Sequence, residues 1–522
     1  MARTIALFAS LAILLPGLAF AQAQPAAPPR PAEQAQPAPQ NRAQTGSGQE
    51  ITGKRLPADV TTAHSIELPG RTLRFSATAG ALPLVDPQGV VQAELAYVAY
   101  TAAGSDARTR PVTFFLNGGP GASSAYLHLL VASPWRLPLG QTSISPSQSP
   151  ALLPNAETWL DFTDLVFLDP VNTGYSRASG SPDEIRERYL SVESDIGSIT
   201  AAISRWLRQN DRLASPKFFV GESYGGFRGP LVVQKLQTEL GIGMSGAILL
   251  SPVLDFGLLG RPRHDPMEFV SRLPSLAAAR LERDGVANRS ALADVERYAA
   301  GEYLVDLTRG LQDREAVGRV SARVAELTGL PAELVRRHAG RIGMGTFQSE
   351  FRRAEGRVAS AYDTGVTTFD ADPTTDRAEG GDAVLTAMQA PLSTAMVDHL
   401  WRTLGWRVPN QRYELLNGSV SGGWRYGRGR QAPQVMDELK VALALDPQFR
   451  VLVAHGLTDL VTPYFASELL LRQIPAYGGE TRAMLTTYPG GHMFYTRDSS
   501  RAAFRADAEK LIRNAGERPD GN

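Results

Sequence analysis

Residues 217–226 read KFFVGESYGG, a short apolar run followed at once by a serine between glycines. The segment matches G-x-S-x-G, the pattern of a serine at a tight turn from a strand into a helix. Small residues two positions either side of Ser223 let the backbone bend this sharply without a clash. The following helix would also direct positive peptide dipoles towards developing negative charge. The pattern predicts that Ser223 is a nucleophile; the alternative is a plain glycine-rich turn, since the chain has 49 glycines.

Further apolar, β-rich runs too short for helices occur on both sides of this segment: 112–116, 165–168, 247–250 and 451–454. Runs without alternation suit strands buried on both faces of a parallel sheet. Earlier segments, 65–68, 72–76 and 94–100, alternate apolar and polar residues, which favours antiparallel strands. The sequence therefore predicts an α/β fold of the α/β-hydrolase type, with a mostly parallel central sheet that starts antiparallel.

The strand pattern stops after Asp255. From there to about residue 395 the chain turns to charged, Ala/Leu/Arg-rich stretches with helical spacing. Examples are Leu276 to Glu282, then Val320, Val324 and Leu327, then Leu334, His338 and Ile342. Helical insertions in such folds usually lie over the carboxyl ends of the strands, where ligands bind. We interpret residues 256–395 as a helical lid insertion that divides the hydrolase core into residues 56–255 and 396–515.

The amino-terminal segment has its own composition. Arg3 precedes an apolar run from Ile5 to Leu15, and Ala19-Phe20-Ala21 gives the small-x-small pattern of a signal cleavage site. Residues 1–21 are predicted to be a cleaved export signal; a retained anchor is disfavoured because about 20 apolar residues are needed to cross a bilayer. Residues 22–55, rich in Pro, Ala and Gln, are predicted to be a disordered spacer. We therefore expect an exported protein, periplasmic or secreted.

Composition limits the partners. Of 522 residues, 43% are hydrophobic, and 53 Lys and Arg balance 53 Asp and Glu. This is the composition of an ordinary globular protein, and zero net charge argues against nucleic acid or an anionic membrane as partner. No later segment is long and apolar enough to span a membrane, and the absence of cysteine excludes a lipoprotein or a disulfide scaffold. The oligomeric state is left open.

A serine nucleophile needs a base, and the chain offers seven histidines. Because the triad of this fold follows the order Ser, Asp or Glu, His, the base must come after Ser223. Five histidines are set aside because they precede Ser223, lie in the proposed lid or fall in a Trp/Leu-rich helical stretch: His64, His128, His264, His338 and His399.

Two histidines remain. His455 ends the strand-like run 450–454 but precedes Asp459, whereas His492 follows both Asp459 and another strand-like run, 483–487. The order Ser223, Asp459, His492 satisfies the rule, with Asp459 orienting His492 as the base. His455 is assigned a structural role. No His and acidic residues cluster at ligand spacing, so neither a metal nor another cofactor is predicted.

Four motifs in this sequence resemble those of the serine carboxypeptidase family. Residues 117–124, NGGPGASS, are similar to N-G-G-P-G-C-S-S, and residues 221–226, GESYGG, to G-E-S-Y-A-G. Residues 168–176, LDPVNTGYS, resemble L-D-Q-P-V-G-T-G-F-S, and residues 491–493 match G-H-M. Four motifs in the same order are far more specific than any one of them. The similarity extends over roughly residues 60–510, with no matching motif in the lid.

The resemblance implies a set of site residues. It implies Ser223, Asp459 and His492 as the triad, and the backbone N–H groups of Gly119 and Tyr224 as the oxyanion hole. Asn117 and Glu222 would bind the free α-carboxylate of a peptide substrate. An ionised glutamate would repel that anion, so Glu222 would have to hold a proton, which burial promotes by raising its pKa. The full implied substrate-binding set is Asn117, Gly118, Glu222 and Met493.

The sequence also departs from the family pattern. Phe115 stands in place of a tryptophan, Val131 in place of a second glutamate that pairs with the first, and Ala122 in place of a disulfide cysteine. Leu457 replaces an aspartate, and Tyr495 stands where a proline is usual. The carboxylate-binding prediction depends on these positions more than the triad does.

These patterns favour a serine carboxypeptidase that hydrolyses C-terminal residues from peptides through an acyl-enzyme on Ser223. Two alternatives remain open on the same fold: an aminopeptidase, or an esterase or acyltransferase. A further alternative from another class is a non-catalytic binding protein that retains the fold.

Overall fold

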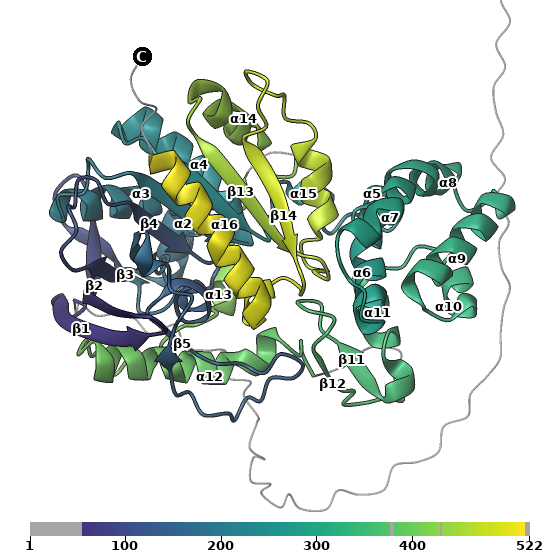
Figure 1. The fold of residues 1–522 in the computed structure, drawn as a ribbon, viewed down its shortest axis with the longest axis horizontal. Coiled ribbons are helices and arrows are strands. Elements are labelled where there is room, and N and C mark those ends of the chain that lie inside the picture. The colour runs from purple at the N-terminus through teal and green to yellow at the C-terminus, as the bar shows by residue number, and fades with distance from the viewer. Residues whose placement is uncertain (1–54, 376–379, 428–430, 517–522) are drawn as a thin grey trace, which may run out of the picture. The chain divides into compact units, whose positions relative to one another are not determined.

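The computed structural model describes residues 55–375, 380–427 and 431–516 (Figure 1). The predicted export signal, residues 1–21, and all but the last residue of the predicted spacer, 22–55, lie outside these ranges. Within the described residues, a ten-stranded sheet forms the centre of the fold. Its strands lie in the order β1 (Val60–Leu68), β2 (Arg71–Val85), β3 (Val91–Ala102), β7 (Asp164–Leu168), β4 (Val112–Leu116), β9 (Lys217–Glu222), β10 (Gly246–Leu250), β13 (Arg450–Gly456) and β14 (Ala483–Tyr488), with β8 (Arg177–Ala178) paired to β3.

Strand direction follows the sequence pattern. β1, β2, β3 and β7 pair antiparallel in that order, and β7, β4, β9, β10, β13 and β14 pair parallel. Every predicted strand run falls inside one of these strands. The α/β-hydrolase fold class predicted from sequence is confirmed.

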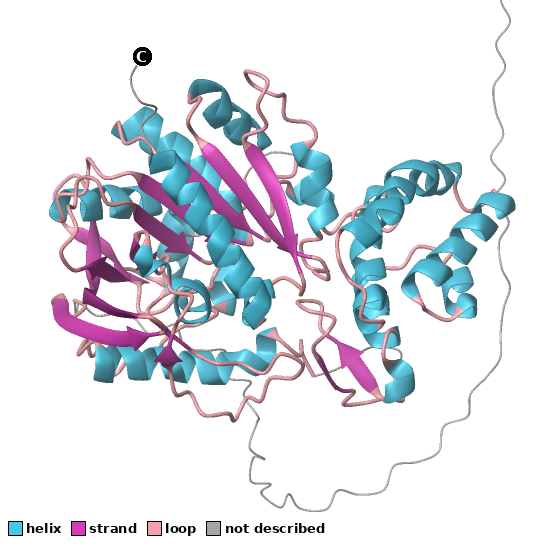
Figure 2. Cartoon of the chain, viewed as in Figure 1, coloured by secondary structure: helices cyan, strands magenta, loops and turns pink. Residues whose placement is uncertain are grey.

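Helices cover both faces of the sheet (Figure 2). Because successive side chains of a strand point to opposite faces, neighbours in β4 enter different cores. Phe114 packs with α3 (Val192–Gln209), α4 (Tyr224–Leu240) and α14 (Met436–Leu445), whereas Phe115 packs in the core that contains α12 (Leu385–Asp398) and α16 (Asp498–Gly516). The parallel strands are therefore buried on both sides, as their uninterrupted apolar runs indicated.

The insertion between β10 and β13 has a hydrophobic core of its own. It contains α5 (Met267–Val270), α6 (Leu273–Arg283), α7 (Ala293–Tyr298), α8 (Leu304–Arg309), α9 (Arg314–Thr328), α10 (Ala332–Arg337), α11 (Met344–Glu350) and the hairpin of β11 (Arg357–Ala359) and β12 (Thr367–Phe369). That core also includes Leu457, Leu460 and Phe465 of the hydrolase core. The expected boundary at residue 395 falls inside α12, whose buried side chains pack in the main core.

One helix prediction within the insertion is wrong. The spacing of Leu334, His338 and Ile342 suggested one continuous helix, but α10 ends at Arg337. Ala339 and Gly340 adopt φ values of 50° and 70°, in the left-handed region that a helix cannot contain. The three side chains therefore do not share one helical face.

Short elements complete the described chain. They are α1 (Ala125–Leu127), η1 (His128–Ala132), β5 (Trp135–Arg136), β6 (Leu153–Pro154), η2 (Trp159–Asp161), α2 (Pro182–Tyr189), η3 (Phe256–Leu258), η4 (Ser290–Leu292), η5 (Ala299–Tyr303), η6 (Arg353–Glu355), η7 (His399–Thr403), α13 (Gly418–Gly423), α15 (Tyr464–Leu471) and η8 (Phe494–Thr496). In the part of the chain described, no helix has both the length and the apolar character that a bilayer crossing requires.

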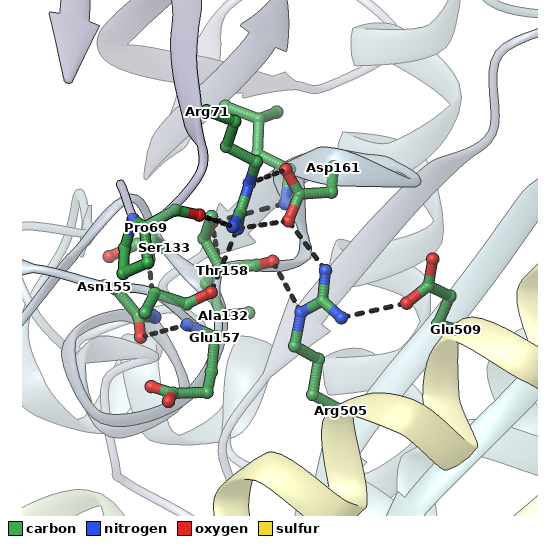
Figure 3. Close-up of polar contacts among 12 residues, drawn as sticks. Pro69, Arg71, Ala132, Ser133, Asn155, Glu157, Thr158, Asp161, Arg505 and Glu509 are labelled. Carbon is green, nitrogen blue, oxygen red and sulfur yellow. Dashed lines mark hydrogen bonds and ion pairs between the residues drawn. The ribbon is translucent and has the colours of Figure 1, made fainter. Parts of the chain in front are cut away.

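Buried polar side chains hold the end of η1, the segment that follows the N-G-G-P-G motif (Figure 3). Asn155 Nδ2 donates to the carbonyls of Val131 at 3.0 Å and Ser133 at 2.8 Å, and Thr158 Oγ1 donates to Ala132 O at 2.8 Å. These bonds satisfy carbonyls that the end of a helical segment leaves without partners.

Ion pairs connect Asp161, the last residue of η2, to distant parts of the fold. Asp161 accepts from Arg71 of β2 at 2.9 and 2.7 Å and from Arg505 of α16 at 2.7 Å (Figure 3). Asp161 thus connects η2 to β2, near the start of the hydrolase core, and to α16, at its end.

Asn155→Ala should destabilise the protein without touching the proposed site residues. Asn155 is fully buried, and its removal leaves two buried carbonyls without a donor. We expect the free energy of unfolding, measured in urea, to fall by about 1–3 kcal/mol. The exposed variant Arg108→Ala serves as control, and equal unfolding midpoints for the two variants would contradict this role.

Candidate active site

Ser223 occupies a sharp turn between β9, which ends at Glu222, and α4, which begins at Tyr224. Its φ of 59° and ψ of −120° lie outside the usual regions for a residue with a side chain. Its N–H donates to Leu250 O at 2.9 Å, and its carbonyl accepts from Gly226 N at 2.9 Å. The turn therefore holds a strained residue between the carboxyl ends of β9 and β10.

The glycines around Ser223 are required by close backbone contacts. A Cβ on Gly221 would lie 2.1 Å from Gly225 O, and a Cβ on Gly225 would lie 2.3 Å from Leu116 O. A Cβ on Gly226 would lie 2.4 Å from the Pro252 side chain. The steric reason given for the G-x-S-x-G spacing thus applies to this turn directly.

Asp459 and His492 are hydrogen-bonded to each other on loops that follow β13 and β14. His492 Nδ1 lies 2.8 Å from Asp459 Oδ2, and both side chains are buried. The other carboxylate oxygen of Asp459 accepts the backbone N–H groups of Val461 at 2.8 Å and Thr462 at 2.9 Å. The acid is thereby fixed in orientation and holds one side of the imidazole.

The charge on Asp459 changes the acidity of His492. Burial of the imidazole opposes its protonation, but the nearby Asp459 carboxylate and its hydrogen bond outweigh burial and raise the pKa of His492. This is the effect expected of a carboxylate that stabilises an imidazolium formed during proton transfer.

Ser251, at the end of β10, links the serine turn to the histidine loop. Its Oγ donates to His492 O at 2.9 Å, and the Ser223 N–H bonds the preceding residue, Leu250. Among the described residues, the Ser223 hydroxyl has no hydrogen-bond partner, and it is partly exposed. Ser223, Asp459 and His492 thus lie at the same edge of the sheet, with the serine hydroxyl free.

The backbone of the N-G-G-P-G segment lies against the serine turn. A Cβ on Gly118 would lie 2.6 Å from both Tyr224 N and Glu222 O, and Gly119 adopts a φ of 100°. This contact puts the two expected oxyanion donors, Gly119 and Tyr224, on touching backbone segments. Glycine is needed at Gly118 because a side chain would separate them.

Glu222 is buried beside the serine in a neutral hydrogen-bonding environment. The Tyr495 hydroxyl donates to both of its oxygens, at 2.7 and 2.9 Å, and Asn117 Nδ2 donates to Oε2. Asn117 Oδ1 in turn accepts the Leu127 N–H at 3.0 Å, which fixes the amide orientation. Burial raises the pKa of Glu222 to about 7, although His492, Tyr495 and Asn117 each act to lower it.

Three positions that depart from the family pattern have distinct environments here. Val131 is fully buried in the main hydrophobic core, so it offers Glu222 no polar group. Tyr495 instead supplies the hydrogen bond to Glu222 that a second carboxyl group would have made. Phe115 stacks on Phe167, with ring centroids 4.6 Å apart, and Met493 is buried in the main core.

Two supporting residues were missed by the sequence analysis. The Thr462 hydroxyl lies 2.8 Å from Asp459 Oδ2, 2.9 Å from Ser251 O and 3.0 Å from His492 Nδ1. Fully buried Arg228 donates to the Asn117 carbonyl and pairs with Asp195 at 2.7 Å. A threonine three residues after a loop aspartate is a common turn pattern and could have indicated Thr462; nothing local marks Arg228.

The remaining histidines of the main core are engaged elsewhere. His455 Nε2 bonds Ser467 Oγ at 2.9 Å, and His128 and His399 share the Tyr100 hydroxyl at 2.7 and 2.8 Å. Burial lowers the pKa of His455 to about 4 and that of His399 to about 3. In the ranges described, no three His, Asp or Glu side chains gather as metal ligands would.

The fold and this arrangement define a class: an α/β-hydrolase with a serine, a histidine and an acid at the carboxyl edge of its sheet. Residues 69–254 match the family model described as serine carboxypeptidase. The resemblance to that family inferred from the motifs is confirmed.

Individual relatives extend the comparison. Serine carboxypeptidase-like 16 of Arabidopsis thaliana is 29% identical over 166 residues, 30% of this chain and 36% of that protein. Carboxypeptidase Y homolog A of Arthroderma otae is 27% identical over 166 residues, 31% of this chain and 28% of that protein. The chain thus spans about a third of the length of the curated relatives it matches.

A solved structure supports the fold over a longer range. The prohormone-processing carboxypeptidase Kex1 from Saccharomyces cerevisiae superposes with a TM-score of 0.53, covering 84% of this chain and 92% of that chain. The sequence identity is 15%, so this likeness concerns the fold.

Thr462→Val should slow reactions at Ser223 while leaving the fold intact. Valine keeps the shape of threonine but removes a hydroxyl that contacts both Asp459 and His492. We expect the rate of Ser223 modification by a fluorophosphonate to fall roughly tenfold, the equivalent of one hydrogen bond to a charged group. Thr200 is a buried threonine of α3 away from the site, so Thr200→Val is the matched control. Equal rates for both variants would contradict a role for Thr462 at the site.

Proposed function

We propose that this protein is an exported serine carboxypeptidase that removes residues from the free carboxyl end of peptides. The single observation that carries the proposal is the buried Glu222, held by Asn117 and Tyr495 directly beside Ser223. A carboxyl group with a pKa of about 7 can hold a proton and donate it in a hydrogen bond to a substrate carboxylate. Neither an esterase nor an aminopeptidase needs such a group there.

The proposed reaction proceeds through an acyl-enzyme. Ser223 Oγ attacks the carbonyl of the last peptide bond while His492 Nε2 takes its proton, with Asp459 holding Nδ1–H. The carbonyl oxygen becomes negative and accepts the N–H groups of Gly119 and Tyr224. His492 then protonates the leaving amine, and the C-terminal amino acid departs. Water, deprotonated by the same imidazole, hydrolyses the ester on Ser223.

In this proposal, the Ser223 hydroxyl makes its catalytic hydrogen bond when substrate binds. The Ser223 hydroxyl is free among the described residues, and catalytic hydrogen bonds of unliganded enzymes often tighten only when substrate binds. Asn117, with Nδ2 already oriented by Leu127 and Glu222, would share the α-carboxylate with Glu222. Gly118 and Met493 would line the same region.

The first test compares one peptide in free-acid and amidated forms. We expect the free acid to be cleaved faster by at least about tenfold, the equivalent of one hydrogen bond to a charged group. Release of the C-terminal residue is measured by mass spectrometry, and Ser223→Ala is the control that should abolish it. Equal cleavage of both forms, release from the amino end, or turnover of p-nitrophenyl esters alone would favour the alternative activities.

The second test concerns pH. Glu222 has a pKa of about 7, so the protonated form that binds a carboxylate is lost above neutral pH. We expect kcat/KM for a free-acid peptide to fall on the alkaline side of about pH 7, and Glu222→Gln to remove this limb because an amide donates without titrating. Tyr495→Phe removes bonds that lower the pKa of Glu222, so the limb should move to higher pH. An alkaline limb unchanged in both variants would show that Glu222 does not control it.

A further inference from the structure

Residues 360–366 of the insertion form a compact loop between β11 and β12, here termed the strap. The Ser360 N–H donates to Val366 O at 3.0 Å, which closes the loop. Ser360 Oγ accepts the N–H of Tyr362 at 2.9 Å and that of Asp363 at 3.2 Å. The strap is therefore shaped by its own hydrogen bonds, which makes it a rigid element.

The strap touches the loops that carry both the proposed base and its acid. The His492 N–H donates to the Tyr362 carbonyl, and the Tyr362 ring meets the imidazole edge to face, with centroids 5.1 Å apart. A Cβ on Gly491 would lie 1.8 Å from Tyr362 O. On the acid side, Leu460 N donates to Ala361 O at 3.0 Å. The strap thus contacts the backbone on both sides of the His492 and Asp459 hydrogen bond.

Arg497 ties the strap to the hydrolase core. Its Nη2 pairs with Asp363 Oδ1 of the strap and with Glu282 Oε1 of α6, both at 2.6 Å, and its Nε reaches Asp363 Oδ2 at 3.1 Å. The Asp363 side chain is 3% exposed and that of Arg497 15%, so water screens these charges little. On the other side of the strap, the Asp382 carboxylate accepts hydrogen bonds from the Ser360 hydroxyl at 2.6 Å and from the Ala361 N–H at 2.8 Å.

The insertion does not need Arg497 to stay attached. Its own core includes Leu457, Leu460 and Phe465 of the hydrolase core through apolar contacts. Arg497 lies five residues after His492 along the chain. Its ion pair fixes the position of the strap at Asp363. Removing it would release the Asp363 side of the strap, whereas the bonds to Asp382 and the apolar contacts of the insertion would remain.

We propose that Arg497 is a positioning residue: its pairs with Asp363 and Glu282 fix the strap, and Tyr362 of the strap holds His492 at the angle that proton transfer from Ser223 requires. This inference rests on the proposed function. A displacement of about 1 Å in a catalytic group can slow a reaction on the order of a hundredfold. The insertion then contributes to the position of the proposed base.

The test measures how fast a fluorophosphonate labels Ser223, since this reaction needs the base but no specific substrate. Arg497→Met should lower the second-order rate constant by about 10- to 100-fold. Arg497→Lys, which can keep one ion pair, should fall between this variant and the wild type. Arg319→Met is the matched control, because Arg319 pairs with Asp306 on the exposed surface of the insertion at 2.8 Å.

A second readout separates positioning from stability. With a free-acid peptide, kcat of Arg497→Met should fall while KM changes less than about twofold, because the acid-binding groups are untouched. Arg497→Met labelled at the wild-type rate with an unchanged Tm overturns the proposal. A wild-type protein that is not labelled at Ser223 overturns the proposed function itself.

Variants of Tyr362 test the same proposal independently if Arg497→Met does not fold. Tyr362→Phe keeps the ring against His492, whereas Tyr362→Ala removes it and keeps only the backbone carbonyl. Labelling of Tyr362→Phe should be at least severalfold faster than labelling of Tyr362→Ala. Equal rates for the two variants contradict the role assigned to the strap.

Discussion

Three backbone segments meet at Ser223 so closely that no side chain fits between them. Gly118 lies against the amide of Tyr224, Gly225 against Leu116 O, and Gly221 against Gly225, with no space for a Cβ at any of the three glycines. These contacts hold Ser223 at a φ of 59° between β9 and α4. The proposed nucleophile Ser223, the two expected oxyanion donors and Glu222 therefore take their places from one steric arrangement, formed before any substrate binds.

Two buried carboxyl groups near the nucleophile differ in their partners. Asp459 is held by two backbone N–H groups and by contacts with Thr462 and His492, and its charge raises the pKa of His492. Within the described part of the chain, the Glu222 carboxyl group has an amide and a phenol as its hydrogen-bond partners, and burial raises its pKa to about 7. Their different surroundings thus suit Asp459 to orient His492 and Glu222 to carry a proton. The Tyr495 hydroxyl hydrogen-bonds Glu222 in a chain that has Val131 where a second glutamate is usual, and burial raises the pKa of Glu222 although this bond acts to lower it.

The sequence predicted the strands because they depend on local patterns, and the proposed site residues were identified from local motifs in the same way. Uninterrupted apolar runs mark strands buried on two faces, and the glycines around Ser223 mark a turn with no space for side chains at those positions. Arg228, Tyr362 and Arg497 could not be found this way, since each acts on a residue more than one hundred positions away or through an ion pair with the insertion. The helix expected through His338 failed because Ala339 takes a left-handed conformation that periodicity does not reveal.

In the proposed reaction, His492 activates Ser223 for covalent catalysis. Rapid-quench mass spectrometry with an activated ester substrate tests it most directly, because an acyl group trapped on the chain can be assigned to one residue. We expect an acyl adduct on Ser223 in the wild-type protein within the first turnover, and its loss in His492→Ala. An adduct on another residue, or one that forms equally fast in His492→Ala, would contradict it.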